Sequence, residues 1–208
     1  IYGDHGFEKS TGTTKKNRIG TKLILPDGRE FNYSLAGEAI TAGKVTMGAA
    51  HAASDHIKDR AVAAAAAVGD KTITVTNGGS TAVTANMFDD GYLFVNDEAG
   101  EGQTFKIKSH TTAATSANFV VTLYDNDSVR TALTTSSQVG FQKALGSDVE
   151  VWDADDITGP PLGVPACDVA SGAYFWNQVK GPAAVLATGT VVLGKNVMTA
   201  NADGTAVV

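Results

Sequence analysis

Two apolar stretches in the middle of the chain flank an acidic turn, and they give the clearest structural signal in the sequence. Residues 92–95 are apolar at every position, which is typical of a strand covered on both faces, whereas residues 104–108 alternate between apolar and polar side chains. Gly100 and Gly102 lie where the chain must reverse, and glycine adopts the positive φ angles of such turns without steric cost. We therefore predict two adjacent strands joined by a turn.

Short strands of the same kind recur along much of the remaining chain. Stretches rich in valine, threonine and aromatic residues occupy residues 71–76, 119–124, 149–152 and 190–193, with turns of aspartate, glycine and proline between them. No long amphipathic helix separates these strands, although we expect one short helical turn within residues 127–137. The pattern predicts an all-β chain with little helix, folded as a single antiparallel sandwich or barrel domain.

Nearer the N-terminus, residues 21–34 predict a β-hairpin. Residues 23–25 are apolar, residues 26–28 read Pro-Asp-Gly as a turn, and Phe31 and Tyr33 alternate with polar residues in the second strand. A hairpin of this length buries too little apolar surface to be stable alone. We therefore expect it to pack on the main domain or on a neighbouring subunit.

The alanine-rich residues 36–68 allow two interpretations. Alanine favours helix, and the charged residues 55–60 would suit a solvated helical turn. However, Gly43 and Gly48 interrupt the start, and no wide stripe of large apolar side chains is present. An extended, alanine-lined segment packed closely on its neighbour is therefore equally consistent with the pattern.

The first residues of the chain carry a charge opposite to that of the whole. Residues 1–22 contain five lysine or arginine residues and two acidic ones, whereas the chain has a net charge of −6. Such asymmetry predicts an extended arm that is mobile in the free protein and becomes ordered on another surface, with Lys15, Lys16 and Arg18 as candidate contacts. A flexible, solvated tail is the simpler alternative.

Length and composition narrow the domain organisation and the function classes. We divide the 208 residues into the arm (1–20), the hairpin with the alanine-rich connecting segment (21–68) and the main β domain (69–208). A pI near 5.1 argues against nucleic-acid binding, which needs clustered lysine and arginine. No apolar run approaches 18 residues, so no membrane span is expected, and the single Cys167 cannot form an internal disulfide.

Two aspartate-rich stretches resemble fragments of calcium-binding loops. They are residues 125–128 and 153–156, and carboxylate oxygens are the ligands that calcium prefers. A calcium loop of the helix–loop–helix type ends on a glutamate at its twelfth position, and counting from Asp153 reaches Val164 instead. We therefore predict turns in which the aspartates accept hydrogen bonds from nearby backbone groups.

Catalytic patterns are equally weak. Residues 54–56 read Ser-Asp-His, but consecutive residues cannot approach one another as a catalytic triad requires. His51 and His56 are five residues apart, which is not the spacing that places two zinc ligands on one helix face. We therefore expect no enzymatic activity, no metal and no cofactor.

Several stretches resemble the decoration, or cement, proteins of tailed-bacteriophage capsids. They are residues 26–33 (PDGREFNY), 91–102 (GYLFVNDEAGEG), 169–178 (VASGAYFWNQ) and 181–185 (GPAAV). The resemblance spans residues 19–208 and rests on glycine and aromatic residues in predicted strands. It implies a structural virion protein that binds the major capsid protein on the outer surface of an icosahedral phage capsid and stabilises contacts between capsomers.

The expected assembly is a homo-oligomer, with a trimer favoured over a dimer because icosahedral shells present local three-fold positions. Alternate residues of a strand face opposite sides, so at least one ring among Tyr174, Phe175 and Trp176 is expected at a capsid or subunit contact. A strand covered on both sides within one chain is the alternative. A further alternative is a carbohydrate-binding β module on a virion or cell surface, in which Trp152 and these rings would stack on sugars.

Overall fold

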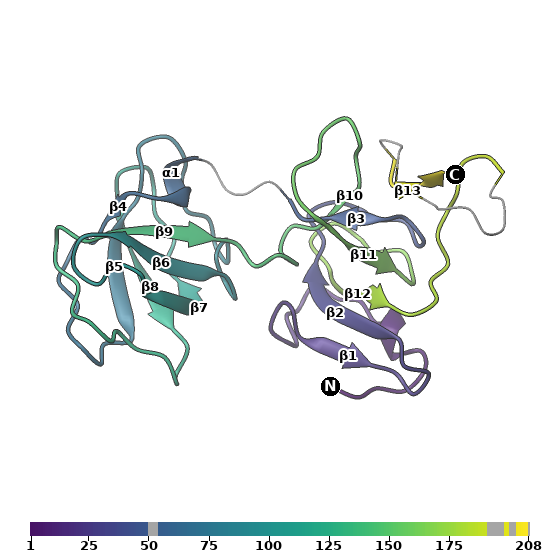
Figure 1. Ribbon diagram of the computed structural model, residues 1–208, viewed down its shortest axis with the longest axis horizontal. Coiled ribbons are helices and arrows are strands. Elements are labelled where there is room, and N and C mark those ends of the chain that lie inside the picture. The colour runs from purple at the N-terminus through teal and green to yellow at the C-terminus, as the bar shows by residue number, and fades with distance from the viewer. Residues whose placement is uncertain (50–53, 191–197, 200–202, 208) are drawn as a thin grey trace. The chain divides into compact units, whose positions relative to one another are not determined.

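The computed structural model describes residues 1–49, 54–190, 198–199 and 203–207, and these are mainly β-strands and turns (Figure 1). Two compact units are present: unit 1 comprises Ile1–Ala50 and Leu145–Val208, and unit 2 is His51–Ala144. The all-β, antiparallel prediction is confirmed. The predicted boundaries at residues 20 and 68 differ from this division, because the last third of the chain pairs with strands near its beginning.

Unit 1 is built on a six-stranded antiparallel sheet of order β1-β2-β12-β11-β3-β10. A short 3-10 turn precedes it in the chain, and a separate two-stranded pair, β13 and β14, lies near the C-terminus. The elements are η1 (Phe7–Lys9), β1 (Lys22–Ile24), β2 (Glu30–Leu35), β3 (Thr46–Met47), β10 (Glu150–Val151), β11 (Pro161–Pro165), β12 (Tyr174–Lys180), β13 (Met198–Thr199) and β14 (Ala206–Val207).

Strands β1 and β2 form the hairpin that the sequence predicts, with Gly28 at a φ of 82° in its turn. The hairpin packs on its own unit, because β2 pairs with β12 from Leu35 opposite Tyr174 to Glu30 opposite Lys180. The centre of the sheet thus joins the beginning of the chain to its end.

Consecutive aromatic residues of β12 face two separate apolar clusters. Phe175 is 1% exposed and Trp176 is 2% exposed, on opposite faces as the alternation of a strand requires. The first cluster includes Ile40, Val149 and Val169, and the second includes Leu23, Phe31 and Tyr33. This strand is therefore covered on both faces within one chain, which was the alternative to a subunit contact.

The first 20 residues lie against unit 1, which corrects the prediction of a free arm. The backbone of Gly3 donates to Ile24 O at 3.1 Å, and Gly12 forms a two-hydrogen-bond bridge with Tyr174. Ile19 is only 9% exposed. The charge pattern did not reveal these anchors, because they are apolar contacts and backbone pairing rather than attraction between charges.

Unit 2 is a six-stranded sheet of order β4-β9-β6-β7-β8-β5 that closes on itself. Its two end strands meet where Val62 bridges Val75 and where Ala63 N donates to Thr74 O at 2.8 Å. Closure removes the unpaired strand edges that an open sheet exposes. The elements are α1 (Ser54–Ile57), β4 (Arg60–Ala61), β5 (Thr72–Thr76), β6 (Tyr92–Asp97), β7 (Thr104–His110), β8 (Asn118–Leu123) and β9 (Gln138–Gln142).

The core of unit 2 confirms one predicted strand pattern and corrects another. In β7, Phe105 and Ile107 are buried as predicted. In β6, however, Leu93 and Val95 are buried while Tyr92 is 42% exposed, so the strand is not covered on both faces. Lys106 Nζ lies 3.9 Å from the centre of the Tyr92 ring, which lets an aromatic residue occupy the outer face.

The remaining local predictions have mixed outcomes. The extended interpretation holds for the alanine-rich residues 61–67, which contain the end of β4 and two isolated bridges, whereas α1 has only four residues. Residues 127–137 form turns and a bridge without the predicted helical turn. Of the predicted strand at residues 190–193, residues 191–193 lie outside the described residues.

The same local backbone arrangement precedes strands in both units. A buried residue forms an isolated bridge, the next four residues make a turn closed by an N–H···O=C hydrogen bond of 3.0–3.3 Å, and a strand follows. The third turn residue usually has a positive φ, as at Gly172 (73°) and Ser116 (59°). The five turns are residues 41–44, 67–70, 114–117, 134–137 and 170–173.

Candidate functional site

Four aromatic side chains gather on one side of the unit 1 sheet, and we name Phe7, Tyr33, Tyr174 and Trp176 the aromatic cluster. Tyr33 stacks on Tyr174 with ring centres 5.5 Å apart and meets Trp176 edge-on at 4.9 Å. Phe7, in η1, reaches Trp176 at 6.0 Å. The N-terminal segment therefore covers an aromatic side chain that would otherwise face solvent.

A small cleft lies between the aromatic cluster and the N-terminal segment. Its volume is about 100 Å³. This volume is well below the roughly 300–1,000 Å³ of typical small-molecule pockets. Its other lining residues are Ser10, Thr11, Gly12, Thr14, Lys16 and Asn17.

Only some of the predicted contact residues come together here. Lys16 lines the cleft beside Tyr174 and Trp176, and its backbone N–H donates to the Tyr33 hydroxyl at 3.1 Å. Lys15 is half-buried and Arg18 is exposed, and neither lines the cleft. Phe175 belongs to the other apolar cluster, so these residues do not form one exposed contact surface.

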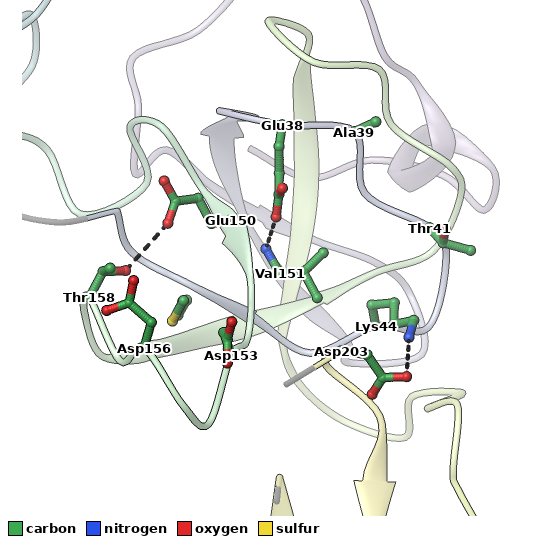
Figure 2. A pocket seen from close by; sticks show the side chains of 11 residues that line it. Glu38, Ala39, Thr41, Lys44, Glu150, Val151, Asp153, Asp156, Thr158 and Asp203 are labelled. Carbon is green, nitrogen blue, oxygen red and sulfur yellow. Dashed lines mark hydrogen bonds and ion pairs between the residues drawn. The ribbon is translucent and has the colours of Figure 1, made fainter. Parts of the chain in front are cut away.

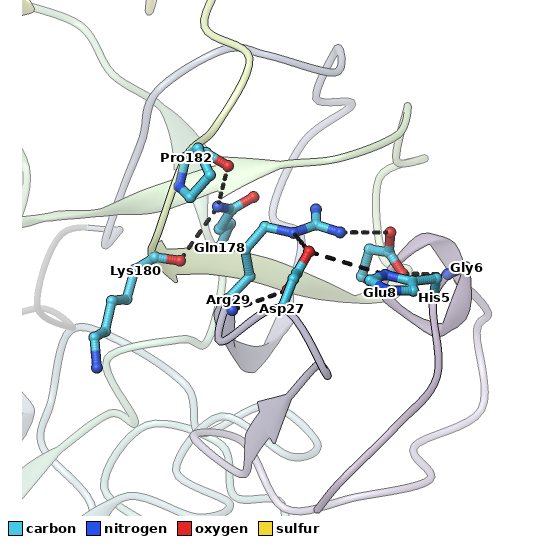
Figure 3. A network of polar contacts seen from close by, with 8 residues as sticks. All are labelled: His5, Gly6, Glu8, Asp27, Arg29, Gln178, Lys180 and Pro182. Atoms are coloured by element: carbon cyan, nitrogen blue, oxygen red, sulfur yellow. Dashed lines mark hydrogen bonds and ion pairs between the residues drawn. The ribbon is translucent and has the colours of Figure 1, made fainter.

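A polar network ties η1 to the hairpin turn (Figure 3). The Arg29 guanidinium contacts Asp27 through Nε at 2.7 Å and Glu8 through an Nη atom at 3.5 Å. Glu8 is 4% exposed and also accepts from Gly6 N at 2.6 Å. The hydrogen bond from Arg29 lowers the pKa of Asp27, and the same bond raises the pKa of Arg29.

The chain leaves β12 through a second set of contacts in the same region. The Gln178 side-chain amide donates to Lys180 O at 3.2 Å and to Pro182 O at 2.9 Å (Figure 3). Farther on, Leu186 N donates to Gly43 O at 2.9 Å. Residues 182–186 then line a pocket of about 250 Å³.

Exposed apolar side chains follow this exit from the sheet. Val179, Val185 and Leu186 are 39%, 39% and 43% exposed, and we name these three residues the apolar rim. No charged residue occurs in the sequence between Lys180 and Lys195. Phe175 and Trp176, two of the predicted contact rings, are buried, whereas the residues that follow them reach the surface from Val179 onward.

A larger pocket of about 410 Å³ in unit 1 is lined by acidic residues (Figure 2). Its carboxylates already have protein partners: Glu38 accepts from Val151 N at 2.7 Å, and Asp203 pairs with Lys44 at 3.1 Å. Hydrogen bonds from Thr205, together with Lys44, lower the pKa of Asp203 to about 2. The acidic lining residues are Glu38, Glu150, Asp153, Asp156 and Asp203.

The acidic pocket has the turn chemistry that the sequence predicts. Asp153 Oδ1 accepts from Asp155 N at 2.8 Å, which confirms the hydrogen-bonded aspartate turn at this position. Within the described residues, no group of three or more His, Cys, Asp or Glu side chains is arranged to hold a metal ion. The pocket as a whole could not be predicted from the sequence, because its lining residues are far apart in the chain.

Cys167 has the surroundings of an unreactive thiol. Its Sγ donates to Lys9 O at 3.4 Å, which adds a contact between the N-terminal segment and the loop before β12. Burial raises the pKa of the thiol, and nearby Asp168 raises it further. Because the thiolate is the nucleophilic form, this environment disfavours nucleophilic chemistry at Cys167.

The part of the chain that the structure describes holds no helix with both the length and the apolar character needed to cross a membrane. Comparisons with protein-family models, with curated proteins and with solved structures gave no match to this chain.

Proposed function

We propose that this protein is a structural virion protein that binds the outer surface of an icosahedral phage capsid and stabilises contacts between capsomers. The resemblance of its sequence to capsid decoration proteins motivates the proposal. In this proposal its partners are the major capsid protein and further copies of itself, and it acts by covering surface rather than by chemical turnover.

The apolar rim is the observation that carries the proposal. Val185 and Leu186 lie in an exposed segment without charged residues, and the centres of protein interfaces are likewise depleted of charged side chains. The rim begins at Val179 near the end of β12 and continues beyond that strand, so the predicted contact moves from Phe175 and Trp176, which are buried, to residues 179–186. The nearly closed barrel of unit 2 suits a crowded shell because its end strands meet each other at Val62 and Val75, which limits the strand edge open to neighbouring copies.

If several copies bind the capsid together, weak contacts between each copy and the shell are sufficient for stable binding. A trimer at a local three-fold position would present three apolar rims to the shell at once. Tethered contacts of this kind raise the effective affinity by roughly 10²-fold or more over a single contact.

Co-sedimentation with purified expanded heads of the phage tests the function. The double variant Val185→Asp/Leu186→Asp is expected to reduce head occupancy at least tenfold, because it places two charges in the proposed contact. Val68→Asp is the matched control, since Val68 is 66% exposed and belongs to unit 2. Wild-type protein that leaves heads bare but binds a glycan array as a monomer would favour the carbohydrate-binding alternative instead.

A further inference from the structure

The side chain of His56 in α1 is fully buried, and its partner determines which nitrogen carries the proton. His56 Nε2 lies 2.9 Å from Asn77 Oδ1. The Asn77 amide has a fixed orientation, because its Nδ2 donates to Thr81 O at 2.8 Å and to Ala114 O at 3.0 Å. Its Oδ1 is thus an acceptor, so His56 Nε2 must donate and Nδ1 is the unprotonated nitrogen.

His110, at the end of β7, has the opposite arrangement. Phe88 N donates to His110 Nε2 at 3.1 Å, and His110 Nδ1 lies 3.0 Å from Thr111 O, to which it must donate. Its side chain is also fully buried. The two rings are therefore neutral in opposite tautomers, with one lone pair on each.

Phe88 lies between the two histidines. Its ring centre is 5.3 Å from that of His56 and 5.7 Å from that of His110, and the Phe88 side chain is itself buried. The carboxylate that faces His110 is Asp89, whose Oδ1 lies 3.8 Å from Nε2. The neighbouring Asp90 accepts a hydrogen bond from the Tyr124 hydroxyl.

We propose that His56, Phe88 and His110 form an acid-sensitive latch that holds α1 on the barrel of unit 2. Protonation of His56 would place a second N–H in a buried position where, among the described residues, Nδ1 has no hydrogen-bond partner. Protonation of His110 would set its Nε2–H against the Phe88 N–H, whereas the Asp89 carboxylate at 3.8 Å favours the charged ring, so the acid sensitivity is carried by His56. Acid therefore favours a state in which α1 is released.

The proposed latch involves the element with which the described part of unit 2 begins. α1 is the first described element of unit 2, and it contacts β9 in the barrel wall. The backbone carbonyl of Ile57, its last residue, lies close to Gly140 of β9. Release of α1 would thus detach Ser54–Ile57 from β9 and leave the rest of the barrel ladder in place.

The size of the effect follows from proton uptake. An exposed imidazole is half-protonated near pH 6.5, so an opening that exposes one ring becomes about 30-fold more populated between pH 7.5 and 5.0, and one that exposes both becomes about 10³-fold more populated. The sign is fixed, because the open state binds more protons than the closed state and is therefore favoured as pH falls.

Hydrogen exchange read by mass spectrometry, corrected for the pH dependence of intrinsic exchange, measures this opening directly. Peptides covering residues 54–62 and 86–92 should lose about 30-fold or more of their protection at pH 5.0, while peptides of β2 and β12 keep theirs. The variant His56→Gln/His110→Gln should abolish the loss, because glutamine supplies a donor or acceptor near each Nε2 position and does not titrate. Equal protection at both pH values in the wild type would refute the latch.

Nitrogen chemical shifts of the imidazoles give a second test that needs no variant. His56 should report a protonated Nε2 and His110 a protonated Nδ1 at pH 7.5, with the 57%-exposed His5 as the internal reference. A doubly protonated His56 ring with undiminished protection of residues 54–62 would overturn the proposal.

Discussion

Replacing Trp176 by alanine tests whether this side chain stabilises the fold of the single chain or a contact between subunits. Trp176 is 2% exposed and packs between Tyr33 and Phe7. Removing a buried tryptophan of this kind costs about 3–5 kcal/mol of unfolding free energy, against a total of about 5–15 kcal/mol for a typical domain. At roughly 4 °C per kcal/mol for a unit of this size, the melting temperature of unit 1 should fall by roughly 12–20 °C.

Urea unfolding followed by circular dichroism, with light scattering on the same samples, measures this loss. Phe7→Ala is the graded control, because Phe7 is 46% exposed and should cost only about 1 kcal/mol when it is truncated. The oligomeric mass should not change where the Trp176→Ala variant is folded. A variant that keeps wild-type stability within about 1 kcal/mol but loses oligomeric mass would show that the ring serves a subunit contact instead.

Three further predictions concern the two units. Gly140→Ala should destabilise unit 2 by about 1–3 kcal/mol in thermal unfolding, because its Cβ would lie 2.1 Å from the last carbonyl oxygen of α1, whereas Gly79→Ala should be nearly neutral. Salt bridges to Lys180 and Lys22 hold the pKa of Glu30 at about 2, so this carboxylate stabilises unit 1 above about pH 4.5 and the contribution disappears as pH falls toward 2. Lys180→Gln should therefore raise the Glu30 pKa in an NMR titration and shift this acid loss to higher pH. Deleting residues 51–144 should leave unit 1 folded with its tryptophan fluorescence unchanged, because β3 and β10 on either side of the insertion pair directly; an unfolded product would refute the independence of unit 1.

The local pattern of apolar and polar residues predicts a strand correctly where that strand buries one face and its turn is short. The alternation around Phe105 and the Pro-Asp-Gly turn before β2 each predict their element correctly. Strand β6 was interpreted less well, because Tyr92 and Phe94 are apolar yet point outward. Phe94 can do so since Gly140 on the neighbouring strand has no side chain where the Phe94 ring lies.

Pairing between segments that are far apart in the sequence could not be predicted from these local patterns. Nothing near Gly12 or Leu35 in the sequence indicates that both pair with Tyr174, so neither the docked N-terminal segment nor the insertion of unit 2 could be predicted. The recurring bridge and turn was missed for another reason. Its residues change from Val-Ala-Ser-Gly to Ala-Ala-Thr-Ser while the backbone stays similar, so only the spacing of a buried apolar residue and a turn residue carries the signal.

The insertion of unit 2 between β3 and β10 also imposes an order on folding during synthesis. Strand β2 cannot meet β12 until the ribosome has made residues 51–144, which takes roughly 5–20 s at 5–20 residues per second. Throughout that delay the nascent hairpin exposes Phe31 and Tyr33, whereas unit 2 can complete its barrel as soon as β9 emerges. Strand β12 therefore finishes the sheet that β1 and β2 began.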